Sequence, residues 1–276
     1  MHCSVRSSLP DHYRPTMPSY NTVAFVTRAI NFGESDRILT LYSRDIGRFG
    51  VIAKGARKPV SRLSGSTEVL NCTKFHLARG KSLDIVTQCE IHDSFVDLRR
   101  DLQRMAHALY LVELLDHSVE DRVPHPPLFD LLYSAFHLIE RTKQPDLICR
   151  WFEIRLFGEL GYAPILVECA VCGTALQPYS SALEYGLSAS LGGALCEVHS
   201  HADRNPDHSG LSGDALQLLA KLVAIDPNDA EILLEMSGTL PHPANQIRIA
   251  MRRYHRFRDD RELKSLSFLD SVCHAF

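Results

Sequence analysis

The residues best suited to chemistry in this sequence are cysteines and histidines that lie together in one short segment. Cys169 and Cys172 form a Cys-x-x-Cys pair, and after 23 intervening residues Cys196 and His199 form a Cys-x-x-His pair. Zn²⁺ prefers thiolate sulfur and imidazole nitrogen, and the x-x spacing lets two ligands reach one ion without strain. The pattern therefore predicts a four-ligand zinc site, with His201 as an alternative to His199.

This zinc ion is predicted to be structural. A catalytic zinc site usually keeps an open position beside a general base, whereas four protein ligands close the coordination shell. The sequence has neither the His-x-Glu motif of zinc deaminases nor the His-Glu-x-x-His motif of metalloproteases. It also has no phosphate-binding loop and no Gly-x-Ser-x-Gly elbow, so we expect a protein that is not an enzyme.

The rest of the chain points to a cytoplasmic protein without a membrane partner, and the family resemblance described below implies association with the nucleoid. No run of 18 apolar residues occurs, and residues 1–16 lack the apolar core of a secretory signal. We expect these residues to form a disordered extension, with Met17 as an alternative start. The other cysteines are scattered, mostly through apolar patterns typical of free thiols: Cys3, Cys72, Cys89, Cys149 and Cys273.

Charge is distributed unevenly along the chain. Residues 17–92 contain 11 Lys and Arg against 6 Asp and Glu, whereas residues 93–168 contain 8 against 13. The basic excess favours a polyanionic partner for the N-terminal part, and a solvated basic face is the alternative. Within it, the stretch "AKGARKPVSR" has the turn residues of an exposed loop. The predicted DNA contacts are Arg37, Lys54, Arg57, Lys58 and Arg62.

Aromatic residues near these cations could stack on bases. Tyr42, Phe49 and Phe75 are the candidates, but each fits the core of the fold equally well, and Phe75 fits it better. A second group of cations, Arg248, Arg252 and Arg256, follows the outer face of a C-terminal helix. We expect those arginines to pair with the acidic segment 93–168, and an acidic-peptide site is the alternative.

The basic residues lie among short strands. Between Thr22 and His92, five short β-branched stretches are separated by turn signals and show no helical period. Closing five strands into a barrel removes exposed edges, so an OB-type β-barrel is predicted for residues 17–95.

After the barrel the apolar period becomes helical, and residues 96–276 are predicted to form a mainly α-helical domain. A zinc module is inserted at residues 168–201, where helix signals are weak and a short hairpin or loop is expected. The fold class is therefore α+β with several domains. Helices are predicted at 97–119, 128–142, 145–161, Leu211–Ala224, Pro227–Met236 and Ala244–Arg258.

Several segments, taken in order, resemble the bacterial RecO family of recombination mediators. They are "AFVTRAINFGESDRILTLYSRDIGRFGVIAKGARKPVSRL", "LRRDLQRMAHALYLVELL", "FEIRLFGELGYAPILVECAVCG", "GGALC" and "RELKSLSFL". No single segment is specific, but the ordered combination is, and it covers nearly the whole chain from about Thr22.

The resemblance implies an OB barrel followed by a helical domain with a four-ligand zinc module. It implies binding of single- and double-stranded DNA, strand annealing, and partnership with RecR and single-stranded-DNA-binding protein in loading RecA. By position it makes Lys54, Arg57 and Lys58 DNA contacts, and it makes the four Cys and His residues above zinc ligands. In many members a fourth cysteine stands at the position of His199, and residues 1–16 have no counterpart.

Two other classes of function compete with this one. The chain could be a non-catalytic adaptor whose helical domain and C-terminal arginines bind an acidic peptide, with DNA binding incidental. A zinc hydrolase or deaminase is the catalytic alternative, and the missing motifs disfavour it.

Overall fold

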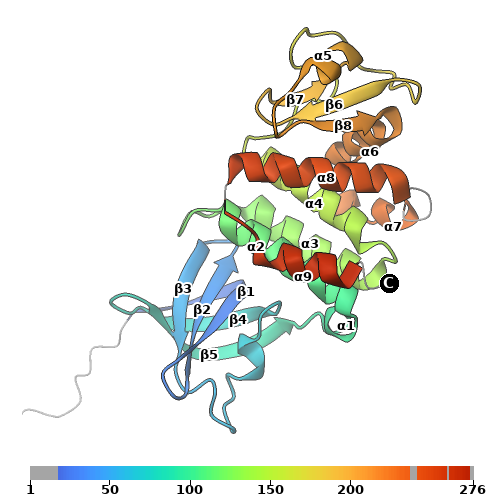
Figure 1. Ribbon diagram of the computed structural model, residues 1–276. Helices are drawn as coiled ribbons and strands as arrows, with labels where there is room; N and C mark the ends of the chain where they lie inside the picture. The colour runs from blue at the N-terminus through green and yellow to red at the C-terminus, as the bar shows by residue number, and fades with distance from the viewer. Residues whose placement is uncertain (1–17, 237–240, 260, 274–276) are drawn as a thin grey trace, which may run out of the picture.

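The computed structural model describes residues 18–236, 241–259 and 261–273. A β-barrel forms one end of the molecule, a helical bundle forms the middle, and a small three-stranded sheet lies at the other end (Figure 1). The predicted extension, residues 1–16, lies outside the described residues. Within the described residues, no helix is long and apolar enough to span a bilayer.

The barrel has five strands in the order β1-β2-β3-β5-β4. Neighbouring strands are antiparallel except β3 and β5, whose short parallel pairing closes the barrel. Alternate residues point inward, as the period of a strand requires, and build a separate apolar core. The strands are β1 (Ser19–Phe32), β2 (Asp36–Ser43), β3 (Gly47–Ala53), β4 (Cys72–Ala78) and β5 (Asp84–Asp93). A 3-10 turn, η1 (Gly65–Thr67), lies between β3 and β4.

The helical bundle agrees with the predicted helical region but differs from it in detail. Its elements are α1 (Val96–Arg100), α2 (Leu102–Ser118), α3 (Pro126–Arg141), α4 (Pro145–Glu159), α6 (Gly213–Ala224), η2 (Pro227–Asp229), α7 (Ile232–Met236), α8 (Pro241–Arg258) and α9 (Lys264–Cys273). The helix predicted at 97–119 is broken at Asp101, which has an extended backbone and accepts a hydrogen bond from the Arg104 N–H at 3.0 Å. An N-cap of this kind starts a new helix, so a continuous apolar period does not guarantee one continuous helix.

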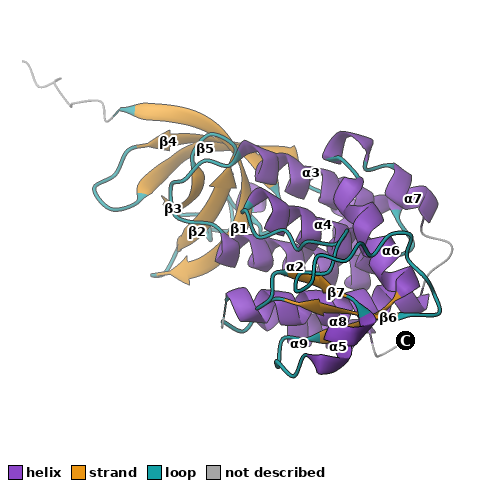
Figure 2. Ribbon diagram, turned by 90° about the horizontal axis from the view of Figure 1, so that it is seen from above, coloured by secondary structure: helices purple, strands orange, loops and turns teal. Residues whose placement is uncertain are grey.

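The third part of the molecule is a sheet in the order β7-β6-β8, which lies beside α8 and far from the barrel (Figures 1 and 2). Strands β6 (Glu184–Ser188) and β7 (Gly193–Leu195) form the predicted hairpin, followed by the short helix α5 (Glu197–Ala202). Strand β8 (Ser209–Ser212) was not predicted, and it comes from residues beyond the expected end of the module at 201.

The barrel is joined firmly to the bundle. Phe25 on β1 packs against the rings of Phe95, Phe129 and Phe136, with ring centroids 5.1 to 6.0 Å apart. The Tyr42 hydroxyl donates a hydrogen bond to a backbone carbonyl at the start of α3. Buried aromatic packing of this kind fixes the orientation of the barrel relative to the helices.

Candidate metal centre and nucleic-acid interface

Four side chains, two from the first cysteine pair and two from the start of α5, converge on one point. One ligand atom from each of Cys169, Cys172, Cys196 and His199 lies within 4.8 Å of all the others. The His199 Nδ1 atom is 3.1 Å from the Cys196 Sγ and 3.6 Å from the Cys169 Sγ, and the Cys172 and Cys196 Sγ atoms are 4.0 Å apart. Ligands of a tetrahedral zinc ion lie about 3.5–3.8 Å apart, so this spacing fits one ion.

Backbone contacts hold the two pairs in place. The Gly173 N–H bonds to the Cys169 carbonyl at 2.9 Å, and Gly173 adopts φ +68°, which closes the first turn. The Ala170 N–H bonds to the carbonyl of Ala194, two residues before the second pair, at 2.9 Å. Cys196 is the N-cap of α5, so His199 falls about one helical turn later on the same side.

The thiols of the cluster are in different environments. Burial opposes ionisation of Cys169, but backbone N–H donors, that of Cys196 first, outweigh it and lower its pKa to about 7. Hydrogen bonding to Thr174, whose Oγ1 is 3.2 Å from the Cys172 Sγ, lowers the pKa of Cys172. Burial raises the pKa of Cys196. The thiolate is the form that binds a metal, and a lower pKa favours it at Cys169 and Cys172.

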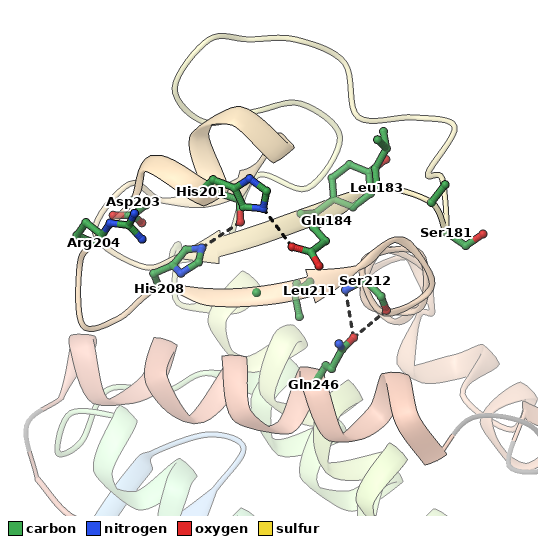
Figure 3. Close-up of a pocket in the computed structure, with 14 residues that line it drawn as sticks. Ser181, Leu183, Glu184, His201, Asp203, Arg204, His208, Leu211, Ser212 and Gln246 are labelled. Carbon is green, nitrogen blue, oxygen red and sulfur yellow. Dashed lines mark hydrogen bonds and ion pairs between the residues drawn. The ribbon is translucent and has the colours of Figure 1, made fainter.

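His201 lies away from the cluster. Its Nε2 atom is 3.1 Å from a Glu184 carboxylate oxygen, and 61% of its side chain is exposed. Figure 3 shows both residues on the wall of a polar pocket of about 720 Å³ lined by residues of α5, β6 and β8, with Gln246 of α8 at its edge. The structure therefore brings His199, and not His201, into the group with the three cysteines.

The chemistry of these donors is that of a closed metal site. Three thiols and one imidazole can fill all four positions of a tetrahedral ion. Within the described part of the chain, no further His, Cys, Asp or Glu joins the group. The cluster can hold a metal ion, and its position between the first cysteine turn, β7 and α5 ties these segments together.

The basic residues form a different kind of site at the other end of the molecule. We call residues 54–62, between β3 and η1, the basic loop. An Asp36 carboxylate oxygen accepts a hydrogen bond from the Gly55 N–H at 2.8 Å, and that bond lowers the pKa of Asp36. The Arg57 N–H bonds to the Ser35 carbonyl at 2.8 Å. The Arg57 guanidinium donates to the carbonyls of Gly33 and Glu34 in the β1–β2 turn, each at 3.3 Å. The loop is thus attached to that turn.

The predicted DNA contacts fall into three groups. Lys54, Lys58 and Arg62 are exposed, and their side chains form no hydrogen bond or ion pair with any residue that the structure describes. Arg57 is exposed but also anchors the loop. Arg37 differs, because it pairs with Glu68 at 2.9 Å and only 20% of its side chain is exposed. The geometry gives Arg37 a partner within the barrel and leaves the other four side chains exposed to solvent.

Tyr42, Phe49 and Phe75 are core residues, each no more than 2% exposed. Phe49 and Phe75 belong to the core of the barrel and Tyr42 is covered by the bundle, so none of them presents a ring to a base. Sequence reasoning overlooked Phe32, which is 51% exposed at the end of β1. Its position directly before the Gly33 turn was the only signal in the sequence.

The C-terminal arginines do not all behave as predicted. Arg252 pairs with Asp270 on α9, with Nη to carboxylate distances of 3.0 and 2.5 Å. That partner lies outside the acidic segment 93–168, and α9 itself was not predicted. The Arg248 Nη2 atom lies 2.5 Å from the side-chain oxygen of Asn245, on the same helix.

Comparison with known families agrees with this architecture. The model for the N-terminal part of recombination protein O matches residues 17–95, which hold the barrel, and the model for its C-terminal part matches residues 99–240. The chain belongs to the RecO family. Its OB-like barrel and its helical region with the cysteine cluster correspond to the two matched parts.

Proteins named DNA repair protein RecO are similar over almost their whole length. The one from Pelotomaculum thermopropionicum is 35% identical, with 92% of this chain and 94% of the relative covered. The one from Symbiobacterium thermophilum is 34% identical, with 93% and 98% covered. The one from Roseiflexus is 35% identical, with 92% and 86% covered. Family membership places this chain in recombinational DNA repair.

Proposed function

We propose that this RecO-family chain is a non-catalytic recombination mediator that binds single- and double-stranded DNA through the basic loop. It anneals strands and helps RecR to load RecA onto DNA coated by single-stranded-DNA-binding protein. The observation that carries the DNA-binding part is the loop itself, in which Lys54, Lys58 and Arg62 are exposed and form no hydrogen bond or ion pair with the residues that the structure describes. The annealing activity and the protein partners rest on the family resemblance.

The electrostatics of the loop support a backbone contact. A cation with no partner in the protein can neutralise a phosphate and release the counterion condensed on it, and this release drives binding. A cation that is already paired, such as Arg37 with Glu68, would first have to give up its partner. The phosphate contacts are therefore assigned to Lys54, Arg57, Lys58 and Arg62, and Arg37 is assigned a supporting role.

Zn²⁺ is the ion proposed for the cysteine cluster, and its role is structural. Cys169, Cys172, Cys196 and His199 would hold it, which leaves no open position for substrate or water. The cluster also lies at the far end of the bundle from the basic loop (Figure 1). Its contribution to DNA binding is therefore limited to keeping the helical region folded.

A salt series tests the assignment of the loop. We expect the double variant K54A/K58A of the full chain to lose about tenfold in affinity for single-stranded DNA at low salt. Its plot of log affinity against log salt should become shallower by about 1.4, because each lost phosphate contact removes about 0.7 from the slope. The measurement is fluorescence anisotropy with a labelled oligonucleotide.

Lys143 and Lys221 provide a matched control, since both are exposed lysines of the helical region. The variant K143A/K221A should keep the wild-type slope. If K54A/K58A also kept it, the basic loop would not be the DNA site. An adaptor that binds an acidic peptide would then be the better description.

A further inference from the structure

The outer face of strands β1, β2 and β3 carries an apolar row that the helices leave uncovered. Ile30 on β1 lies opposite Ile38 on β2, and Ile38 lies opposite Ile52 on β3. Phe32 follows two residues after Ile30 and so shares its face. We call these four residues the apolar platform.

A β-bulge in β1 determines which way the platform faces. The register pairs Val26 with Leu41 and Arg28 with Thr40, which leaves Thr27 as the extra residue. A bulge shifts the alternation of side chains by one residue. Because of it, Arg28, Ile30 and Phe32 point outward, and they would otherwise point toward the barrel interior.

The platform is more exposed than a core-forming face should be. Ile30 is 45% exposed and Phe32 is 51% exposed, while Ile38 and Ile52 are partly exposed. At the helical end of the same face, Phe25 and Tyr42 are covered by the bundle. The uncovered part therefore begins where the contact with the helices ends.

Cations border the platform on the side of the basic loop. Lys54 follows β3 two residues after Ile52, and Arg57 attaches the basic loop to the turn that follows Phe32. Arg28 is exposed on β1, two residues before Ile30. Two acidic residues lie at this border. Glu34 is exposed in the β1–β2 turn, and the carboxylate of Asp36 accepts the Gly55 N–H and lies close to Lys54 and Lys58.

An apolar surface next to exposed cations matches the chemistry of one polymer. Single-stranded DNA exposes flat bases on one side and phosphates on the other, and OB folds bind such strands by stacking bases while cations follow the backbone. A duplex keeps its bases stacked inside, so it can offer this face only phosphates. Such an arrangement would favour unpaired over paired DNA.

We propose that the apolar platform, with Phe32 as its aromatic member, receives the unpaired bases of single-stranded DNA while the basic loop holds the phosphates. This inference rests on the proposed function and names the residues that select single strands. Phosphate contacts supply affinity for both forms of DNA, and the platform adds affinity for unpaired strands only.

The test is the variant F32A of the full-length, zinc-loaded chain, measured with oligothymidylate and with the duplex of that strand. We expect about a tenfold loss of affinity for the single strand, the usual size of one lost stacking contact. The salt slope should not change, because an apolar contact releases no counterions. Duplex affinity should also be unchanged.

Two further variants complete the experiment. F32W should restore the single-strand affinity, because it keeps an aromatic surface. I91A is the matched control, since Ile91 is 42% exposed on β5, opposite Thr73 of β4 and outside the platform. It should leave both affinities unchanged.

An unchanged single-strand affinity for F32A, or an equal loss for the duplex, would overturn the platform. In that event the expected loss of affinity in K54A/K58A would leave the proposed function intact, and only the role of the apolar platform would be rejected. If K54A/K58A instead kept the wild-type affinity and salt slope, the proposed function itself would be rejected.

Discussion

The cysteine cluster and the basic loop are opposites in how their polar groups are satisfied. In the cluster, three thiols and an imidazole face one another, so their ligand atoms are directed toward a shared point inside the protein. In the loop, Lys54 and Lys58 are exposed and have no side-chain partner in the described chain, although the backbone between them is held firmly. The residues with the richer metal chemistry face one another, and the lysines are the side chains exposed to a ligand.

The largest effect is expected from breaking the cluster. C169S should abolish stoichiometric zinc binding and reduce the free energy of unfolding by on the order of 5 kcal/mol. Small zinc modules gain about 10–16 kcal/mol from the metal, but this one also packs on α8 and α6. Zinc content is read by mass spectrometry and stability by urea unfolding. Below the unfolding transition, DNA affinity should stay near that of the wild type.

Two histidines provide a matched pair for the same comparison. H199A should lose zinc as C169S does, whereas H201A should keep it, since His201 faces Glu184 and not the cysteines. Loss of zinc in H201A alone would reverse the ligand assignment. If C169S and H199A both lost DNA binding while still folded, the cysteine cluster and the basic loop would not be functionally independent.

Removing a buried charge from the bundle should lower stability without changing the cysteine cluster or the basic loop, so it separates a general loss of stability from a local effect. Arg150 is fully buried, its Nη1 atom is 2.9 Å from a Glu153 carboxylate oxygen, and Glu153 is bonded by the Tyr110 hydroxyl. R150M should cost about 3–5 kcal/mol of unfolding free energy because it leaves the Glu153 carboxylate buried without its cation. Urea unfolding measures that cost, and zinc content and the DNA salt slope should both remain normal.

The smallest effect is expected from the anchor of the loop. R57K keeps the charge but cannot reproduce the planar guanidinium that reaches two carbonyls of the β1–β2 turn. Single-strand affinity should fall about threefold, equivalent to about 0.7 kcal/mol, with the salt slope unchanged. Because R57K keeps the positive charge, a change of slope would mean that losing the anchor also removes phosphate contacts made by other residues of the basic loop.

The features predicted well are those that depend on neighbours in the sequence. Cys169 and Cys172 lie in one turn, and Cys196 and His199 lie in one turn of helix, so their pairing is a local property. The five strands follow from β-branched runs between turn residues, and the basic loop follows from its composition. The break at Asp101 was also local, but the apolar period continues across it and hid the N-cap.

Features that depend on distant segments were missed. Arg252 pairs with Asp270 on a helix that was not predicted, and β8 joins β6 from more than twenty residues away. Phe32 could not be recognised as exposed, because its direction depends on the bulge between Val26 and Arg28 and on the place where the helices stop covering the barrel.

By itself, the sequence determined the metal-binding residue types and spacing, the barrel-then-helices order and the basic character of one loop. These depend on local propensity and on short-range spacing, which a chain carries wherever it folds. Only the tertiary structure decided that His199 and not His201 faces the cysteines, that Arg37 is held by Glu68, and that Phe32 is left open. Those outcomes depend on which surfaces are buried against each other, and burial is a property of the packed molecule.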